Sequence, residues 1–409
     1  MRTFDKSNQL FERAMNVIPG GIPGHQSPTL LVFGQSPCFI ERAEGPRFWD
    51  VDGNEYIDYM CAYGPMVIGY NEPKVEAAFR AQSQKTDTGN LPSERYVELA
   101  ERLVEIIPIA DWSIFGKNGS DVTSYALRVA RAQTGRSKII MAEGSYHGIG
   151  AWCISFDTGI MPGERADILT FEYNDTEGFK RLVEDNKDDV AGVIITPFRH
   201  DAFHDSEMPA PGFHETIRKT CDDIGAIFIV DDVRAGFRMH MGGSLEQFGV
   251  RPDLICFSKA LGNGHPISAC VGRNALKDAA SQVFFTGSFF TSAAPMAAAL
   301  ATLEEMEAND SIKIMYERGE MLKDGMLDQA DTHQQEVSYT GPETLPFMTF
   351  KSEDGWERAK LFCQECYQRG VFFHPFHNWF ISAAHTEEDI KKTLEVTDAA
   401  FKLVKEQMG

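Results

Sequence analysis

The sequence is poor in basic residues and contains no long apolar run. Lys and Arg number 39 against 60 Asp and Glu, which gives a formal net charge of −21 at pH 7. Because nucleic-acid backbones bind Lys/Arg-rich surfaces, this balance argues against nucleic acid as a partner, whereas anionic small molecules need only local positive charge. No apolar stretch approaches the ~20 residues of a membrane span. Residues 1–6 lack a basic region followed by an apolar one, so we expect neither a signal peptide nor a membrane partner.

Cysteines are few and scattered, at positions 38, 61, 153, 221, 256, 270, 363 and 366. Cys363 and Cys366 form a C-x-x-C, but no second pair exists to complete a zinc site. We therefore expect no metal, and we interpret the cysteines as reduced thiols of a cytoplasmic protein.

The remaining composition is typical of a globular protein with a sizeable core, at 43% hydrophobic and 24% charged residues. The length of 409 residues suits one large two-part enzyme or two to three small domains. We find no internal repeats and no low-complexity linker.

Apolar runs alternate with helical patterns through the middle of the chain. The runs lie at 138–142, 192–196 and 226–230, and the helical patterns at 121–133, 177–184 and 213–224. This alternation predicts an α/β fold with a mostly parallel sheet and helices on both faces. Ligands in such sheets bind at the carboxyl ends of the strands.

Two ionisable side chains stand at such strand ends. Lys259 follows the run 254–257, and Asp231 ends the run 226–230. A lysine that is desolvated, and so has a lowered pKa, is the amine that forms Schiff bases, although Lys259 could also extend into solvent. A pyridine ring that accepts electrons needs an acid partner at its nitrogen, which Asp231 or, failing it, Asp232 could supply.

The segments Val230 to Arg238 and Phe257 to Gly264 resemble the signature of class III aminotransferases, which are pyridoxal-phosphate (PLP) enzymes of fold type I. Within that family the chain is most similar to the glutamate-1-semialdehyde aminomutase branch. The likeness runs from Val17-Ile18-Pro19-Gly20-Gly21 to Ala383-Ala384-His385-Thr386.

The resemblance implies a division of the chain and a central chemistry. It implies a large PLP-binding domain over residues 58–300 and a smaller α+β domain formed by residues 1–57 together with 301–409. It also implies that Lys259 holds PLP as an internal aldimine and that Asp231 keeps the ring nitrogen protonated.

Further cofactor contacts are expected around the same sheet edge. A phosphate needs backbone N–H groups, which a helix N-terminus supplies. Gly119 and Ser120 open the helical pattern near 121–133 and match the phosphate-binding motif of the family, although Ser120 fits a plain N-cap equally well. By resemblance, Tyr146 stacks on the pyridine ring and Val233 presses its opposite face.

The family also places a Gly-Thr pair on the phosphate of the neighbouring subunit, which implies a homodimer. Gly287-Ser288 resembles that pair, and Thr291 could take the role instead because the following connection is longer here. Tyr63 stands where the family often places an aromatic that lines the substrate pocket, but it could equally be a core aromatic.

The expected reaction is a transfer of an amino group between an amino compound and an oxo acid or aldehyde. The alternative is an intramolecular aminomutase, but the run 22–28 lacks the arginine of that branch. Because arginine binds carboxylates through its planar fork, Arg199, just beyond the strand 192–196, is the candidate for a substrate carboxylate. It could also be a surface arginine, and Arg234 is its rival. His200 beside it is either a positive contribution to this edge or a solvated loop residue.

Overall fold

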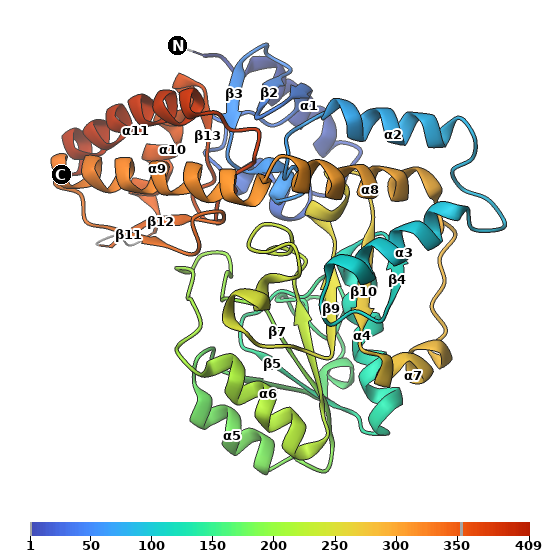
Figure 1. Ribbon diagram of the computed structural model, residues 1–409. Helices are drawn as coiled ribbons and strands as arrows, with labels where there is room; N and C mark the ends of the chain where they lie inside the picture. Colours follow the sequence, from blue (N-terminus) through green and yellow to red (C-terminus); the bar gives the residue numbers. More distant parts are fainter. Residues whose placement is uncertain (1, 352–354) are drawn as a thin grey trace. The chain divides into compact units, whose positions relative to one another are not determined.

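The computed structural model describes residues 2–351 and 355–409, and the chain divides into two compact units (Figure 1). Unit 1 comprises Met1–Glu72, Ala202–Ser206 and Lys313–Gly409, and unit 2 comprises Pro73–Asp201 and Glu207–Ile312. These limits differ from the sequence-based division at 57/58 and 300/301. One reason is that Tyr59 stacks on Phe373 and His385, which holds the segment after residue 57 in unit 1.

Unit 2 is built on a mostly parallel sheet, which confirms the α/β class. In the described residues the sheet has seven strands in the order β4-β10-β9-β8-β7-β5-β6. Their bounds are β4 Trp112–Gly116, β5 Lys138–Ala142, β6 Ile168–Phe171, β7 Val190–Ile195, β8 Ile227–Asp231, β9 Leu254–Phe257 and β10 Ser268–Gly272. β10 is antiparallel to both β4 and β9, and the other pairings are parallel.

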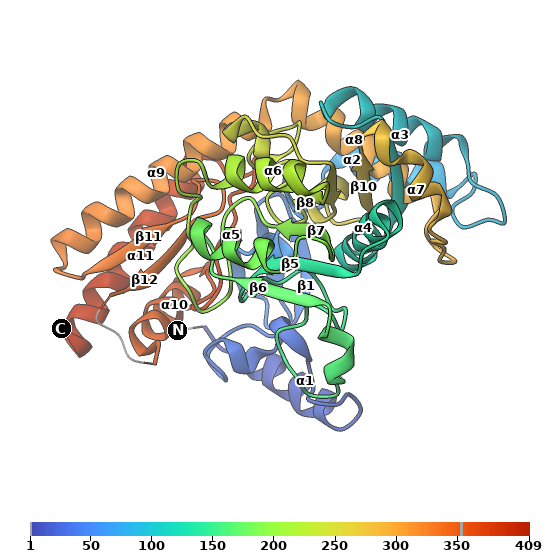
Figure 2. The same ribbon diagram turned by 90° about the horizontal axis from the view of Figure 1, so that it is seen from below.

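Helices cover both faces of this sheet. Figures 1 and 2 show α5 (Thr176–Glu184) and α6 (Phe213–Ile224) on one side and α4 (Gly119–Thr134) with α7 (Lys277–Gln282) on the other. The remaining helices of unit 2 are α2 (Pro73–Ser83), α3 (Glu94–Ile106) and α8 (Ala293–Ala308). Every residue of β7, β8 and β9 is buried, as expected for parallel strands covered on both faces.

Register brings the two central strand ends together. Within the parallel pairs, Ile195 of β7 lies opposite Val230 of β8, and Asp231 lies opposite Cys256 of β9. β8 and β9 therefore end at the same edge, so Asp231 and the residues after Phe257 emerge on one side of the sheet.

Unit 1 is built from both ends of the chain. The strands β1 (Ile40–Glu44), β2 (Arg47–Asp50), β3 (Glu55–Asp58) and β13 (Val371–Phe372) form one sheet, and β11 (Val337–Thr340) pairs with β12 (Phe347–Phe350). Its helices are α1 (Asp5–Met15), most of α9 (Ser311–Thr332), α10 (Glu357–Arg369) and α11 (Glu387–Met408). Parallel pairing of β13 with β3 ties residues near 371 to residues near 57.

A hairpin joins the antiparallel strands β2 and β3. The carboxylate of Asp50 accepts hydrogen bonds from the backbone N–H groups of Asp52 (3.0 Å) and Asn54 (2.8 Å), which fixes the turn. None of the helices in the described part of the chain is long and apolar enough to cross a membrane.

Candidate active site

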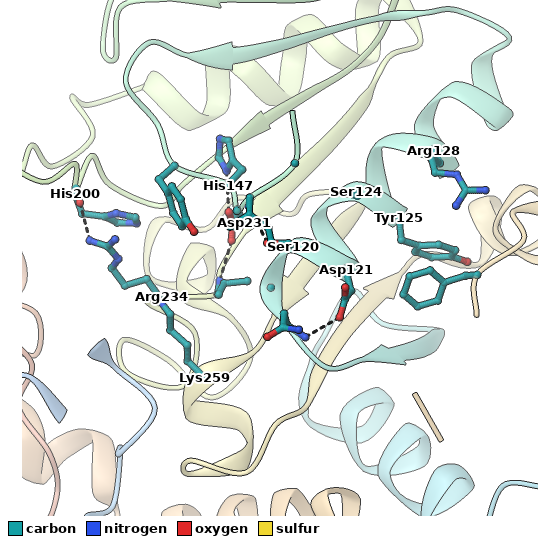
Figure 3. Close-up of a pocket in the computed structure, with 18 residues that line it drawn as sticks. Ser120, Asp121, Ser124, Tyr125, Arg128, His147, His200, Asp231, Arg234 and Lys259 are labelled. Carbon is teal, nitrogen blue, oxygen red and sulfur yellow. Dashed lines mark hydrogen bonds and ion pairs between the residues drawn. The ribbon is translucent and has the colours of Figure 1, made fainter. Parts of the chain in front are cut away.

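A cavity of about 620 Å³ lies in unit 2 at the carboxyl ends of the central strands (Figure 3). Its lining includes all but one of the residues expected to contact the cofactor, namely Gly119, Ser120, Tyr146, Asp231, Val233 and Lys259. These residues come from α4, from the segment after β5, and from the ends of β8 and β9. The structure thus brings together residues that are far apart in the sequence, since Gly119 and Lys259 are separated by 140 positions.

Lys259 lies two residues beyond β9 with its amine enclosed. Burial is the main cause that lowers the pKa of Lys259 to about 7, and the neighbouring Arg234 lowers it further, while Asp231 acts in the opposite direction. Near neutral pH a substantial fraction of this amine is therefore uncharged and able to act as a nucleophile or base. The backbone of Lys259 is in the left-handed region, with φ +44°.

Asp231 is held by two contacts at the end of β8. Its Oδ1 accepts a hydrogen bond from the backbone N–H of Val233 (3.1 Å), and its Oδ2 lies 2.8 Å from Nδ1 of the buried His147. His147 in turn stacks on Trp152, with ring centroids 6.0 Å apart. The carboxylate thus has a fixed orientation at the cavity wall, and His147 lines the same cavity.

Asp232 points away from the cavity. Its carboxylate accepts hydrogen bonds from the backbone N–H (2.8 Å) and the hydroxyl (2.5 Å) of Ser244. Asp232 is fully buried and is not among the cavity-lining residues. Of the two neighbouring carboxylates, Asp231 is therefore the one placed to meet a bound ring.

The N-terminus of α4 forms another wall. Asn118 is the N-cap, and Oδ2 of Asp121 accepts hydrogen bonds from the backbone N–H groups of Lys117 (3.0 Å) and Asn118 (2.8 Å). Ser120 is therefore not the N-cap, and its hydroxyl instead accepts a hydrogen bond from the backbone N–H of Ile149 (3.0 Å). The negative charge of Asp121 is directed back at the loop before the helix.

Gly119 leaves room beside that wall. A Cβ at this position would lie 2.8 Å from Cγ1 of Val233, which is closer than real side-chain atoms approach. The glycine thus allows the first turn of α4 to approach Val233. This arrangement suits an anionic group such as phosphate.

His200 is a cavity residue whose place the sequence left open. It is buried, with 5% of its surface exposed, and it lines the cavity together with Arg234. Burial and the nearby charges of Arg234 and Lys259 hold the pKa of His200 well below its ordinary value, so the ring is neutral. The expectation of a positive or solvated histidine is therefore wrong. The sequence carried no signal for this, because the neighbouring cations come from other strands.

Arg199 lies outside the residues that line the cavity. Its Nε forms an ion pair with Asp201 (2.8 Å), and its Nη1 lies 4.0 Å from carboxylate oxygens of both Glu172 and Glu207. Three carboxylates surround this guanidinium, so the geometry offers no support for the expected contact with a substrate carboxylate. Arg234 does line the cavity, and its Nη1 donates to the carbonyl oxygen of His200 (2.7 Å).

Two other candidates, Ser288 and Tyr63, are not among the residues that line the cavity. Ser288 is exposed in the segment between α7 and α8, where Thr291 is partly exposed. Tyr63 belongs to unit 1, where its hydroxyl donates to the carbonyl oxygen of His25 (2.7 Å) and its ring packs edge-on against His377.

The cavity residues fit PLP. They provide an amine with a pKa near neutrality, a fixed carboxylate and a glycine-bordered helix N-terminus, which match the aldehyde, the ring nitrogen and the phosphate of that cofactor. Across residues 2–351 and 355–409, no group of three or more His, Cys, Asp or Glu side chains could hold a metal ion.

Comparisons with known proteins agree with this fit. The family model described as aminotransferase class-III matches residues 33–399. An aminopentol aminotransferase from Sphingopyxis macrogoltabida is 43% identical over 98% of this chain and 94% of its own length. A 3-aminobutyryl-CoA aminotransferase from Cloacimonas acidaminovorans is 36% identical over 98% of each chain.

Aminomutases are also similar, at lower identity. A glutamate-1-semialdehyde 2,1-aminomutase from Syntrophobacter fumaroxidans is 34% identical over 99% of each chain. Among solved structures, the PLP internal aldimine form of the FumI protein of Sphingopyxis sp. MTA144 superposes with a TM-score of 0.96, at 43% identity over 98% of this chain and 96% of its own. The chain belongs to the class III aminotransferases, PLP-dependent transaminases of fold type I.

Proposed function

We propose that Lys259 is the amine that carries PLP and moves the proton during transamination, and that Asp231 is the acid partner of the ring nitrogen. The observation that carries this assignment is the enclosure of both side chains in one cavity, with the pKa of Lys259 lowered to about 7. Bound there, PLP supplies an aldehyde that condenses with amines and a ring that takes up the electron pair released at the substrate carbon.

Asp231 acts on that ring through its charge. Its carboxylate favours the protonated ring nitrogen, which makes the ring a better electron acceptor. His147, 2.8 Å from Oδ2, and the backbone N–H of Val233, 3.1 Å from Oδ1, keep the carboxylate in one orientation. The positioning is complete before the cofactor binds, so little reorganisation is required during turnover.

Lys259 Nζ is suited to move a proton between the substrate carbon and the C4′ carbon of the cofactor. A general base works best when its pKa lies near the operating pH, and the pKa of Lys259, about 7, meets that condition. Burial, the main cause of the lowered pKa, also excludes water from the nitrogen that accepts the proton.

The other cavity walls would hold the cofactor in place. Gly119 and Ser120 would offer the N-terminus of α4 to the phosphate, and Tyr146 and Val233, which both line the cavity, would contact the two faces of the ring. Ser288, or Thr291, would reach the phosphate site of a second copy. Such a contact would make the protein a homodimer.

The amino donor is proposed to be a compound whose amino-bearing carbon carries no carboxylate, and the acceptor an oxo acid. The two relatives above support the first part, because their names describe an amino polyol and a 3-amino acyl thioester. Arg234, a cavity cation, is the proposed partner of the acceptor's carboxylate. The eight cysteines are scattered along the chain with one C-x-x-C and no second pair, which supports a reducing, cytoplasmic compartment.

Borohydride reduction of the PLP-loaded protein, followed by peptide mapping, tests the assignment. We expect the pyridoxyl label on Lys259 and its loss in Lys259→Ala. Lys117 is a matched control, because burial also lowers the pKa of this amine, to about 8, although the residue does not line the cavity. Lys117→Ala should keep the label, and a label on any lysine other than Lys259 would refute the proposal.

A further inference from the structure

The turn that follows β3 in unit 1 has an unusual backbone conformation. Cys61, Ala62 and Tyr63 are all left-handed, with φ of +46°, +54° and +63°, and Gly64 follows at +109°. A side chain makes this conformation unfavourable, so three such residues in a row persist only where surrounding contacts enforce them. Strain of this kind is concentrated at ligand-binding and catalytic sites, which makes the side chain presented by the turn a candidate for ligand contact.

Contacts within unit 1 hold this turn and the ring of Tyr63. Oδ1 of Asp58 accepts a hydrogen bond from the backbone N–H of Met60 (2.8 Å), and the hydroxyl of Tyr70 donates to Oδ2 (2.7 Å). The hydroxyl of Tyr63 donates to the carbonyl oxygen of His25 (2.7 Å). The ring of Tyr63 is therefore fixed in position, and it is only half-buried.

Three imidazoles surround that ring. Its centroid lies 4.4 Å from that of His25, 6.1 Å from that of His374 and 5.4 Å from that of His377, and each pair meets edge-on. His374 and His377 are themselves 6.0 Å apart. Tyr63 and these three residues, the histidine cluster, all belong to unit 1.

His374 contributes an open hydrogen-bond donor to the histidine cluster. The residue is 4% exposed, and its Nδ1 accepts a hydrogen bond from the backbone N–H of Phe376 (3.1 Å). Burial and the neighbouring His25 lower the pKa of His374 to about 3, so the ring is neutral and carries its proton on Nε2. Within the described chain no group accepts from Nε2, yet this nitrogen is not one of the fully enclosed atoms that lack a partner, so a ligand atom can reach it.

The chemistry of the histidine cluster favours an uncharged oxygen as the ligand atom. A neutral N–H among aromatic rings offers a hydrogen bond but no charge to balance a carboxylate or a phosphate. A chain that bears a hydroxyl group meets both features, because its carbon atoms pack against the ring of Tyr63 and its oxygen accepts from His374.

The proposed amino donor requires recognition of this kind. Its amino-bearing carbon carries no carboxylate, so the enzyme must select it through the rest of its chain. The main chain also runs directly from the cavity of unit 2 to the histidine cluster, since Phe203 follows the cavity residue His200 by three positions and belongs to unit 1. The ring of Phe203 stacks on Phe376 at 5.3 Å, and its N–H donates to the carbonyl oxygen of Phe376 (2.9 Å).

We propose that His374 determines the specificity for the amino donor by donating its Nε2–H to a hydroxyl group on the donor's chain. This inference rests on the donor class proposed above. It adds a residue that neither the sequence signature nor the comparisons assign to the substrate, and it gives the ring of Tyr63 the task of packing against that chain.

The test compares the PLP-loaded enzyme on pairs of donors that differ in one hydroxyl group. The pairs are the ω-amino alcohols from aminopropanol to aminohexanol and the primary alkylamines of the same chain lengths, so the series covers a range of distances between amine and hydroxyl. For the wild type, kcat/KM should be about two- to tenfold higher for an amino alcohol than for its alkylamine in at least one pair, the effect of one net hydrogen bond.

Two substitutions separate this role from a structural one. In His374→Asn the amide oxygen can still accept from the backbone N–H of Phe376, but no donor remains at the place of Nε2. The preference should therefore disappear through a higher KM for the amino alcohol, with the alkylamine unaffected. In His374→Gln the amide nitrogen can replace Nε2, so part of the preference should remain. A purely structural role predicts the reverse order, because the longer side chain of Gln loses the bond to Phe376.

His214→Phe is the control, because His214 is a buried histidine of unit 2 that does not line the cavity, and it should keep the wild-type preference. His374→Ala is the second loss variant should His374→Asn not fold. A preference that persists in these loss variants, or a wild type that distinguishes the members of no pair, would overturn the role of His374 while the borohydride label stays on Lys259. Conversion of no amine in the series would instead overturn the proposed donor class, and a label elsewhere than on Lys259 would overturn the placement of the cofactor.

Discussion

The adjacent carboxylates Asp231 and Asp232 allow a direct test of which one is the acid partner of the PLP ring nitrogen. Asp231→Asn preserves the shape of the side chain, and the amide oxygen can still accept from the backbone N–H of Val233, now 3.1 Å away. Its amide group can also remain beside Nδ1 of His147, at 2.8 Å in the present structure. The substitution therefore removes the charge and little else, and we expect the variant to retain PLP.

The magnitude follows from the interaction that is lost. A hydrogen bond to a charged group is worth about 1.5–3 kcal/mol. If Asp231 stabilises the protonated ring nitrogen mainly as electrons enter the ring, that loss corresponds to about a 10- to 150-fold fall in kcat/KM. The assay is steady-state transamination with an amino donor that the wild type accepts, alongside a spectroscopic measurement of PLP occupancy.

Asp232→Asn is the matched control. Asp232 is equally buried and immediately adjacent, but its carboxylate is bound to Ser244 and does not line the cavity. We expect its kcat/KM to stay within a few-fold of wild type. An Asp231→Asn enzyme with near-normal rates, or an equal loss in both variants, would show that Asp231 is not the partner of the ring nitrogen.

Three further outcomes are expected. Burial raises the pKa of Asp232 from 3.8 to about 7, so the stability of the wild type should fall as pH rises through that interval. In Asp232→Asn the melting temperature, measured by thermal denaturation, should no longer show this fall with pH. Arg234→Gln should raise KM for oxo acids about tenfold and lower kcat less. Arg199 is paired with Asp201 and does not line the cavity, so Arg199→Ala should leave KM nearly unchanged. The reverse pattern would restore Arg199 as the carboxylate partner. Incubated with glutamate-1-semialdehyde and no amino acceptor, the protein should form little 5-aminolevulinate, and efficient conversion would show mutase activity.

Much of the fold was predictable because the central strands are apolar on both faces. The run 138–142 coincides with β5, and the helical pattern 213–224 coincides with α6. The antiparallel β10 at 268–272 was not predicted as a separate strand, since a short run of small residues carries no periodicity that distinguishes it. The 22-residue helix α9 was also missed, because its apolar residues do not gather on one clear face.

The candidate site could also be predicted only in part. Lys259 and Asp231 were predictable because each follows an apolar run at the end of a strand. Arg199 and His200 follow a third strand, but successive side chains in extended backbone point to opposite sides. His200 lines the cavity, whereas Arg199 pairs with Asp201 and with carboxylates of Glu172 and Glu207, and the periodicity of the sequence does not reveal these contacts.

The backbone conformation at Lys259 lowers the stability of the fold at the residue on which the proposed activity depends. Its φ of +44° lies in the left-handed region, which costs a residue with a side chain about 1–2 kcal/mol, and glycine avoids that cost. Its amine, with a pKa lowered from 10.5 to about 7, binds protons less readily in the folded protein than in the unfolded chain, so the cofactor-free protein should gain stability as pH rises across that interval. An inactive Lys259→Gly protein should therefore melt at a higher temperature than the cofactor-free wild type near neutral pH, with a difference that narrows as the pH is raised. Glycine at position 259 would give a more stable scaffold, but the role proposed for Lys259 requires the amine that glycine lacks.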